Sequence, residues 1–244
     1  MMKVWALTDT GLVRHQNQDA YGVETVCGRT VAVVCDGMGG PRNGDVASNI
    51  AVGAFLSAVR AHLRADMTPE QIREMASYAV SVANMDIRAA VEEHPAYAGM
   101  GTTLVSAVSY GEGVVVSNVG DSRAYLINRE GIQRVSKDHS LVETLVERGE
   151  ITAAEARVHP QRNYITRALG PEVSPLCDGF IVPVVPGDFI LLCTDGLVST
   201  VSDQEMQYEV LYGDDLDRCL DRLLEISKRN GAADNVTAVL LQKQ

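Results

Sequence analysis

Aspartates end or open several apolar, β-branched runs of this chain. Asp36 and Asp195 each come directly after such a run, and each is followed by glycine. Asp121 also closely follows an apolar run, while Asp19 and Asp234 come shortly before one. The ends of strands are rigid, so neighbouring strands can deliver side chains from distant sequence positions to one point. The pattern therefore predicts a cluster of carboxylates.

A carboxylate cluster suits hard divalent cations, because Mg²⁺ and Mn²⁺ bind carboxylates, backbone carbonyls and waters. Gly37 has no Cβ, so its carbonyl can turn toward an ion, and Asp36 could bridge two ions roughly 3.5–4 Å apart. Two such ions would lower the pKa of a bound water and stabilise developing charge, which suits hydrolysis of phosphate monoesters. Arg14 is a candidate for binding the phosphate, because a guanidinium binds phosphate oxygens bidentately.

Turn chemistry is the competing interpretation of these aspartates. Asp-Gly is a leading hairpin turn, and Asp121 sits between two β-rich runs as a turn residue would. Asp36 and Asp195, however, lead toward helical or loop segments rather than toward a matching strand. For Arg14 the alternative is an ordinary solvated surface charge. The pattern alone leaves both alternatives open.

The composition narrows the class of protein. The chain has 244 residues, of which 46% are hydrophobic and 22% charged, as in a globular protein. Its formal net charge of -11, without a cluster of Lys and Arg, disfavours nucleic-acid binding and a metal-dependent nuclease. The five cysteines match no zinc-binding spacing. No apolar run has the length of a signal peptide core or a membrane span, so the sequence predicts a cytoplasmic protein.

The elements that must position the aspartates follow from hydrophobic periodicity and capping signals. The predicted strands are residues 3–8, 21–27, 30–35, 102–109, 113–119, 123–128, 181–185, 189–193 and 236–241. The predicted helices are residues 44–63, 68–93, 141–149, 152–158 and 214–230, with a short one opened by Ser202 and Glu205. Tandem hairpins with clustered helix pairs favour an α+β fold of antiparallel sheets covered by helices. We expect one continuous domain over residues 1–244.

Seven segments of the chain match one known family in that family's order. They are residues 14–19, 36–40, 101–103, 119–123, 165–170, 192–197 and 234–237. On these segments the chain resembles the metal-dependent serine/threonine protein phosphatases of the PP2C type (the PPM family), in their compact bacterial form. The resemblance implies a four-layer α-β-β-α sandwich with two central antiparallel β-sheets flanked by helix pairs. It also implies a flap at about residues 141–167, beside the active site, where substrates are selected.

The resemblance implies a role for each candidate residue at the centre of the site. Asp36 would bridge two ions, Mn²⁺ or Mg²⁺, and the carbonyl of Gly37 would bind one of them. Asp195 and Asp234 would bind the other ion, so that these two and Asp36 form the catalytic set. A metal-bridging hydroxide would then attack the phosphate of phosphoserine or phosphothreonine in a protein substrate.

Three further residues surround that centre in the family. Asp19 would hold a metal-bound water, and Arg14 matches the phosphate-binding arginine. Asp121, together with Asp195, resembles the site of a third, looser ion. The resemblance also implies that the substrates are phosphorylated proteins, including a cognate bacterial Ser/Thr kinase, and that the protein is a monomer.

One position departs from the animal members of the family, which carry a histidine after the Asp-Gly pair as the proposed general acid. Met38 stands there and cannot donate a proton, a feature that bacterial relatives commonly share, and we expect a metal-bound water to be the donor. None of the five histidines has metal-ligand spacing with another. His139, within Asp138-His139-Ser140, is expected to be structural.

Two other functions compete with a general protein phosphatase. A catalytically inactive relative could bind phosphoproteins or a regulator, but such a relative would be expected to have lost ligands, and Asp36, Asp195 and Asp234 are all present. A dedicated phosphatase of an anti-sigma-factor antagonist usually carries extra sensory domains, and we find none in this sequence.

Overall fold

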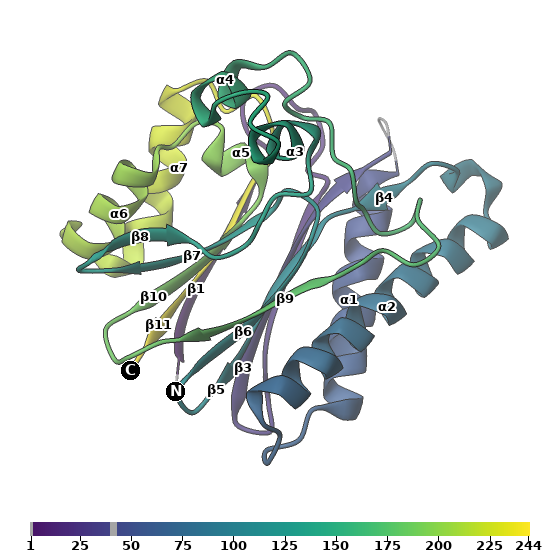
Figure 1. Cartoon of the computed structure of the whole chain (residues 1–244), viewed down its shortest axis with the longest axis horizontal. Coiled ribbons are helices and arrows are strands. Elements are labelled where there is room, and N and C mark those ends of the chain that lie inside the picture. The colour runs from purple at the N-terminus through teal and green to yellow at the C-terminus, as the bar shows by residue number, and fades with distance from the viewer. Residues whose placement is uncertain (1, 40–42) are drawn as a thin grey trace.

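The computed structural model describes residues 2–39 and 43–244. Two antiparallel sheets lie against each other, and each outer face carries a pair of long helices (Figure 1). The predicted α+β fold, the four-layer α-β-β-α sandwich, is therefore confirmed. Gly40, the last residue of the second matching segment, lies outside the described residues.

The first sheet has the strand order β1-β11-β10-β7-β8. Its strands are β1 (Met2–Asp9), β11 (Val236–Lys243), β10 (Phe189–Cys193), β7 (Arg123–Asn128) and β8 (Gly131–Arg134). The second sheet has the order β2-β3-β5-β6-β9, and a short strand β4 pairs with β3. Its strands are β2 (Asp19–Val26), β3 (Arg29–Met38), β4 (Gly101–Thr102), β5 (Leu104–Tyr110), β6 (Gly113–Val119) and β9 (Asp178–Pro183).

The helices form the two outer layers and one end of the molecule. The second sheet is covered by α1 (Gly44–His62) and α2 (Pro69–Glu93), and the first by α6 (Asp203–Tyr212) and α7 (Cys219–Arg229) (Figure 1). The remaining helices, at the top of Figure 1, are α3 (Leu141–Glu147), α4 (Ala153–Val158) and α5 (Asp195–Val198). Two 3-10 turns complete the elements, η1 (Pro95–Tyr97) and η2 (Leu216–Arg218). No helix among the described residues is long and apolar enough to cross a membrane.

Three apolar clusters hold the four layers together. The central cluster joins the facing sides of the two sheets and includes Val34, Val116, Ile190 and Val239. The two other clusters lie between each sheet and its helices. Because β10 is buried on both faces, it is a continuous apolar run instead of an alternating one. Strand β6 is also buried throughout, but its apolar residues are interrupted by Ser117 and Asn118.

The structure corrects several predicted boundaries. The strand predicted at residues 181–185 is β9, which begins at Asp178 because its ladder with β6 extends to the pair Asn118 and Asp178. The helix predicted at residues 214–230 is divided into η2 and α7, and the Asp215 side chain caps η2. Strand β8 was not predicted, since it is short and not buried.

Two connections that resemble hairpin turns in the sequence instead pass between the sheets. Asp121 lies between β6, in the second sheet, and β7, in the first. The turn at residues 186–188 likewise joins β9 to β10 in the other sheet. The interpretation of Asp121 as a hairpin turn residue is therefore wrong.

Helix α2 offers a test of one predicted start signal. Thr68 Oγ1 accepts a hydrogen bond from Gln71 N at 3.3 Å, and Gln71 Oε1 accepts one from Thr68 N at 2.9 Å. We expect Thr68→Ala to lower the free energy of unfolding by about 1 kcal/mol, because the buried face of α2 depends on this start. Thr152→Ala is the control, since it removes the same capping box from α4, which has no buried residue. Urea denaturation should show a clearly smaller loss for the control; equal losses would contradict the assignment.

Candidate active site

Five aspartates converge where the ends of the two sheets meet. Asp19 and Asp36 face each other across the ladder of β2 and β3 in the second sheet. Asp195 begins α5 directly after β10, and Asp234 comes just before β11, the neighbour of β10 in the first sheet. Asp121 lies on the connection between the sheets. All the carboxylates predicted from the sequence therefore come together.

The electrostatics of the cluster show how close these carboxylates are. Burial raises the pKa of Asp36 well above its ordinary value, and the charges of Asp19 and Asp195 raise it further. Burial and the charge of Asp195 raise the pKa of Asp121 to about 8. Burial also raises the pKa of Asp19 to about 7, with Asp195 and Asp234 as the repelling neighbours. Carboxylates that repel one another in this way are stabilised by a cation placed between them.

Arg14 lies at the edge of this cluster, from the loop between β1 and β2. Its Nη2 donates to Asp234 Oδ2 at 2.7 Å, and the two side chains are 53% and 33% exposed. The bond to Asp234 raises the pKa of Arg14, and the charges of Asp36 and Asp195 contribute. The guanidinium is therefore a cation next to the carboxylates and open to solvent.

Two threonines fix the backbone of Asp36. Thr103 Oγ1 accepts from Asp36 N at 2.9 Å, and Asp36 O accepts from Thr103 N at 2.9 Å and from Thr102 Oγ1 at 2.8 Å. Thr103 Oγ1 also lies 2.6 Å from Ser122 Oγ, beside Asp121. The segments at residues 101–103 and 119–123 thus support the cluster through side-chain hydroxyls.

Asn235 and Thr194 connect the first sheet to β2 and to the loop that leads into it. Asn235 Oδ1 accepts from Gln18 N at 2.8 Å, and its Nδ2 donates to Thr10 O at 2.9 Å. Thr194 Oγ1 donates to Asp19 Oδ2 at 2.9 Å. The other carboxylate oxygen, Asp19 Oδ1, is buried and accepts no hydrogen bond from the residues that the structure describes. A buried, unsatisfied carboxylate oxygen is suited to a water held beside an ion.

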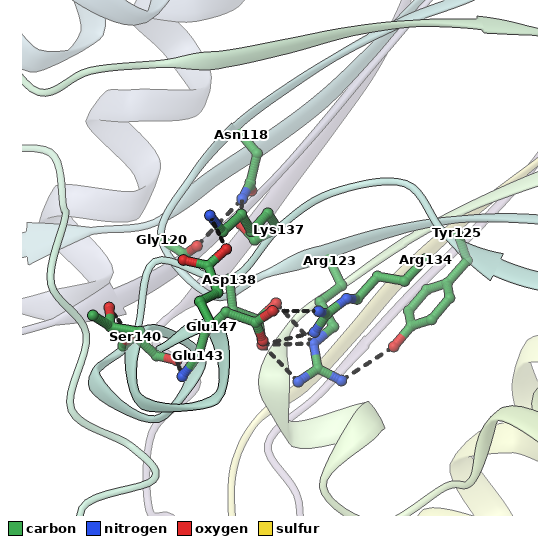
Figure 2. Close-up of polar contacts among 11 residues, drawn as sticks. Asn118, Gly120, Arg123, Tyr125, Arg134, Lys137, Asp138, Ser140, Glu143 and Glu147 are labelled. Carbon is green, nitrogen blue, oxygen red and sulfur yellow. Dashed lines mark hydrogen bonds and ion pairs between the residues drawn. The ribbon is translucent and has the colours of Figure 1, made fainter. Parts of the chain in front are cut away.

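A second polar network, which the sequence reasoning missed, supports the start of the predicted flap (Figure 2). Arg123 Nη2 donates to Asp138 Oδ2 at 2.6 Å, and Nε lies 3.0 Å from both carboxylate oxygens. Arg134 contacts the same carboxylate at 3.5 Å and Glu143 of α3 at 2.8 Å. Ser140 Oγ caps α3 by accepting from Glu143 N at 3.2 Å. The available signals were Arg123, a charged residue in a matching segment, and Asp138, next to His139.

The donor set fits a hard divalent cation. It consists of carboxylate oxygens and a backbone carbonyl, with no thiolate or imidazole among the predicted ligands. Within residues 2–39 and 43–244, no three side chains of His, Cys, Asp or Glu are arranged to hold an ion by themselves. Each ion would therefore need a carbonyl such as that of Gly37 and waters to complete its coordination, as Mg²⁺ ordinarily does.

The comparisons with known proteins decide the family. A profile of the family "Protein phosphatase 2C" matches residues 13–241. The chain belongs to this protein phosphatase 2C family. It is a metal-dependent protein phosphatase of the bacterial PPM type, as the resemblance in the sequence implied.

Individual relatives agree with the family. The chain is 38% identical over 237 residues to the serine/threonine phosphatase stp of Listeria monocytogenes, covering 97% of this chain and 94% of that one. The crystal structure of the serine/threonine phosphatase Stp1 from Staphylococcus aureus superposes with a TM-score of 0.94 at 35% identity, covering 100% of this chain and 96% of that one. The catalytic domain of the phosphatase PstP in complex with 2 manganese ions has a TM-score of 0.83 at 34% identity, covering 99% and 97%.

Gly37 is a position where the phosphatase tolerates no side chain. A Cβ there would lie 2.0 Å from Gly44 O and 2.5 Å from Gln18 O, which are both backbone atoms. We expect Gly37→Ala to lower the free energy of unfolding by several kcal/mol, in the upper range of about 3–5 kcal/mol for single changes. Gly53→Ala is the matched control, because its Cβ would meet nothing within 4 Å inside α1. Urea denaturation should show that this control gains about 0.5–1 kcal/mol; a harmless Gly37→Ala would refute the close approach.

Proposed function

We propose that this phosphatase hydrolyses phosphoserine and phosphothreonine monoesters in proteins, at a centre that holds two divalent ions, Mn²⁺ or Mg²⁺. The observation that carries the proposal is the convergence of Asp36, Asp195 and Asp234 on one self-repelling cluster. The relatives named as serine/threonine phosphatases, and the PstP structure with manganese, support the substrate class and the metal.

The residues of the cluster would divide the ions between them. Asp36 would bridge the pair, with the Gly37 carbonyl on one ion and Asp195 and Asp234 on the other. Asp19 would orient a water through its unsatisfied Oδ1. Asp121 would share a third ion with Asp195. When bound, such ions supply a water of lowered pKa as the nucleophile and stabilise charge on the phosphate.

The side chains around the cluster would handle the substrate. Arg14 would bind the phosphate oxygens and orient the ester, exchanging part of its pairing with Asp234 for the new anion. Met38 is partly buried beside Asp36 and has no proton to give. We propose that a water in the centre protonates the leaving alcohol.

Further proposals concern the substrates, the flap, the domain organisation and the location of this phosphatase. The substrates would be phosphorylated proteins, including a cognate bacterial Ser/Thr kinase, and residues 141–167 would form a flap that selects among them. Residues 1–244 would act as one catalytic domain, monomeric and cytoplasmic.

Asp36→Asn tests the two-ion centre directly. We expect turnover of para-nitrophenyl phosphate and of a phosphothreonine peptide to require MnCl₂, to stop in EDTA, and to be abolished by Asp36→Asn, since the bridging charge is gone. In EDTA the same variant should unfold at a higher temperature than the wild type, because a buried, repelled carboxylate has been removed. The surface variant Asp217→Asn is the control for both measurements. Near-normal turnover by Asp36→Asn would contradict the centre, and no turnover by the wild type would favour an inactive phosphoprotein-binding relative.

Arg14→Ala tests the phosphate-binding role. We expect KM for the phosphopeptide to rise about ten- to a hundredfold with a smaller change in kcat, because a charge-assisted bond to the bound phosphate is lost. Arg14→Lys keeps the charge without the bidentate geometry, so its KM should lie between those of the wild type and Arg14→Ala. Steady-state kinetics at saturating MnCl₂ separate the parameters. A fall in kcat alone would mean that Arg14 acts only in the transition state.

A further inference from the structure

His139 holds the residue that precedes Asp121 by two hydrogen bonds. Its backbone N donates to Gly120 O at 2.9 Å, and its ring Nδ1 accepts from Gly120 N at 3.0 Å. The histidine is only 5% exposed. Gly120 has a φ of +104°, and a Cβ there would lie 2.5 Å from Thr103 Cγ2. The conformation of this peptide is therefore one that the neighbouring residues must maintain.

The other side of the His139 ring faces Asp178, which pairs with Arg167 at the end of the flap. Because Nδ1 accepts a hydrogen bond, the ring proton is on Nε2, which lies 3.2 Å from Asp178 Oδ2. Arg167 Nη1 donates to the other oxygen of that carboxylate at 3.2 Å. His139 O accepts from Thr166 N at 2.7 Å. His139 thus connects residues 166–167 with the peptide of Gly120.

Asp121 has hydrogen-bonded support on both sides. His139 fixes Gly120 on one side, and Thr103 Oγ1 lies 2.6 Å from Ser122 Oγ on the other. The connection between β6 and β7 belongs to neither sheet ladder, so these side-chain contacts take the place of strand pairing. A rotation of the Gly120 peptide would displace Asp121, whose carboxylate lies close enough to Asp195 for its pKa to be raised by that charge.

We infer that His139 is a positioning residue that holds Asp121 at the metal centre and links it to the end of the flap. The inference rests on the proposed ion site at Asp121. It assigns to the Asp138-His139-Ser140 motif a role in metal binding that acts through Gly120, without contact between His139 and an ion.

Two substitutions separate the hydrogen bond at ring Nδ1, from Gly120 N, from the contact at ring Nε2, with Asp178. The amide oxygen of asparagine takes the place of imidazole Nδ1, so His139→Asn keeps an acceptor for Gly120 N. The terminal amide of glutamine takes the place of Nε2, so His139→Gln leaves Gly120 N without its acceptor. Calorimetric titration of the metal-free full chain with MnCl₂ measures binding without relying on activity. Asp121→Asn identifies which ion depends on Asp121.

We expect His139→Gln to weaken that ion about tenfold or more, the usual cost of losing a residue that orients a metal ligand. His139→Asn keeps the acceptor for Gly120 N but loses the contact with Asp178, so it should weaken that ion only several-fold, and the other ions should be unchanged in both variants. His62→Asn is the matched control, because the His62 ring contacts Ala58 O within α1, at the end of the helix opposite Gly44. Unchanged binding of the Asp121-dependent ion by folded His139→Gln would overturn the inference.

Asp178→Asn keeps the inference testable if His139→Gln does not fold. Asp178 is 32% exposed, so the change does not disturb the core. It nevertheless gives one of the two groups that contact the carboxylate, His139 Nε2 or Arg167 Nη1, a poorer partner. We expect the Asp121-dependent ion to bind several-fold more weakly, and unchanged binding in this variant would overturn the inference as well. If Asp121→Asn itself leaves all Mn²⁺ binding intact, the proposed third ion fails and the inference with it. If Asp121→Asn loses an ion that both His139→Gln and Asp178→Asn retain, only the inference fails.

Discussion

The mutual repulsion of five carboxylates at one place is the constraint on which the rest of this structure depends. Burial and neighbouring charge raise the pKa of Asp19, Asp36, Asp121 and Asp195 together, so the folded chain holds charges that disfavour its own compact state. Cations can offset that repulsion, but only where the backbone keeps the carboxylates from moving apart. The buried hydroxyl and amide groups beneath the cluster supply this restraint.

The sandwich architecture explains why the restraint is effective. Asp19 and Asp36 lie on strands of the second sheet, whereas Asp195 follows β10 and Asp234 precedes β11 of the first. Their separation is therefore set by the packing of one sheet on the other through the central apolar cluster, because protein interiors are close-packed. Asn235 reinforces the same distance, since it bonds to the loop that leads from β1 to β2. The packing of the core therefore sets the distances between the aspartates of the site.

The sequence predicted well those strands and site residues that burial or chemistry determines within a short segment. Strand β10 was predicted closely, because burial on both faces demands a continuous apolar run. The aspartates were recognisable because they end or adjoin those runs. The path of β6 into β7 was not predictable, since a hairpin and a crossing between sheets require the same local residues. The pairing of Arg123 with Asp138 was also missed, because it depends on a tertiary contact that neither residue signals alone.

The five aspartates are not held with equal strength, and the difference has a functional consequence. Asp19 and Asp36 lie within a strand ladder, so main-chain pairing holds them in addition to the bonds that Thr102 and Thr103 make to Asp36. Asp121 lies on a connection outside both sheets, and its position depends on contacts made by particular side chains. An ion that uses Asp121 is consequently the one most sensitive to its surroundings. Because those surroundings include residues 166–167, at the end of the proposed flap, movement of that flap would reach an ion at Asp121 before the pair proposed at Asp36.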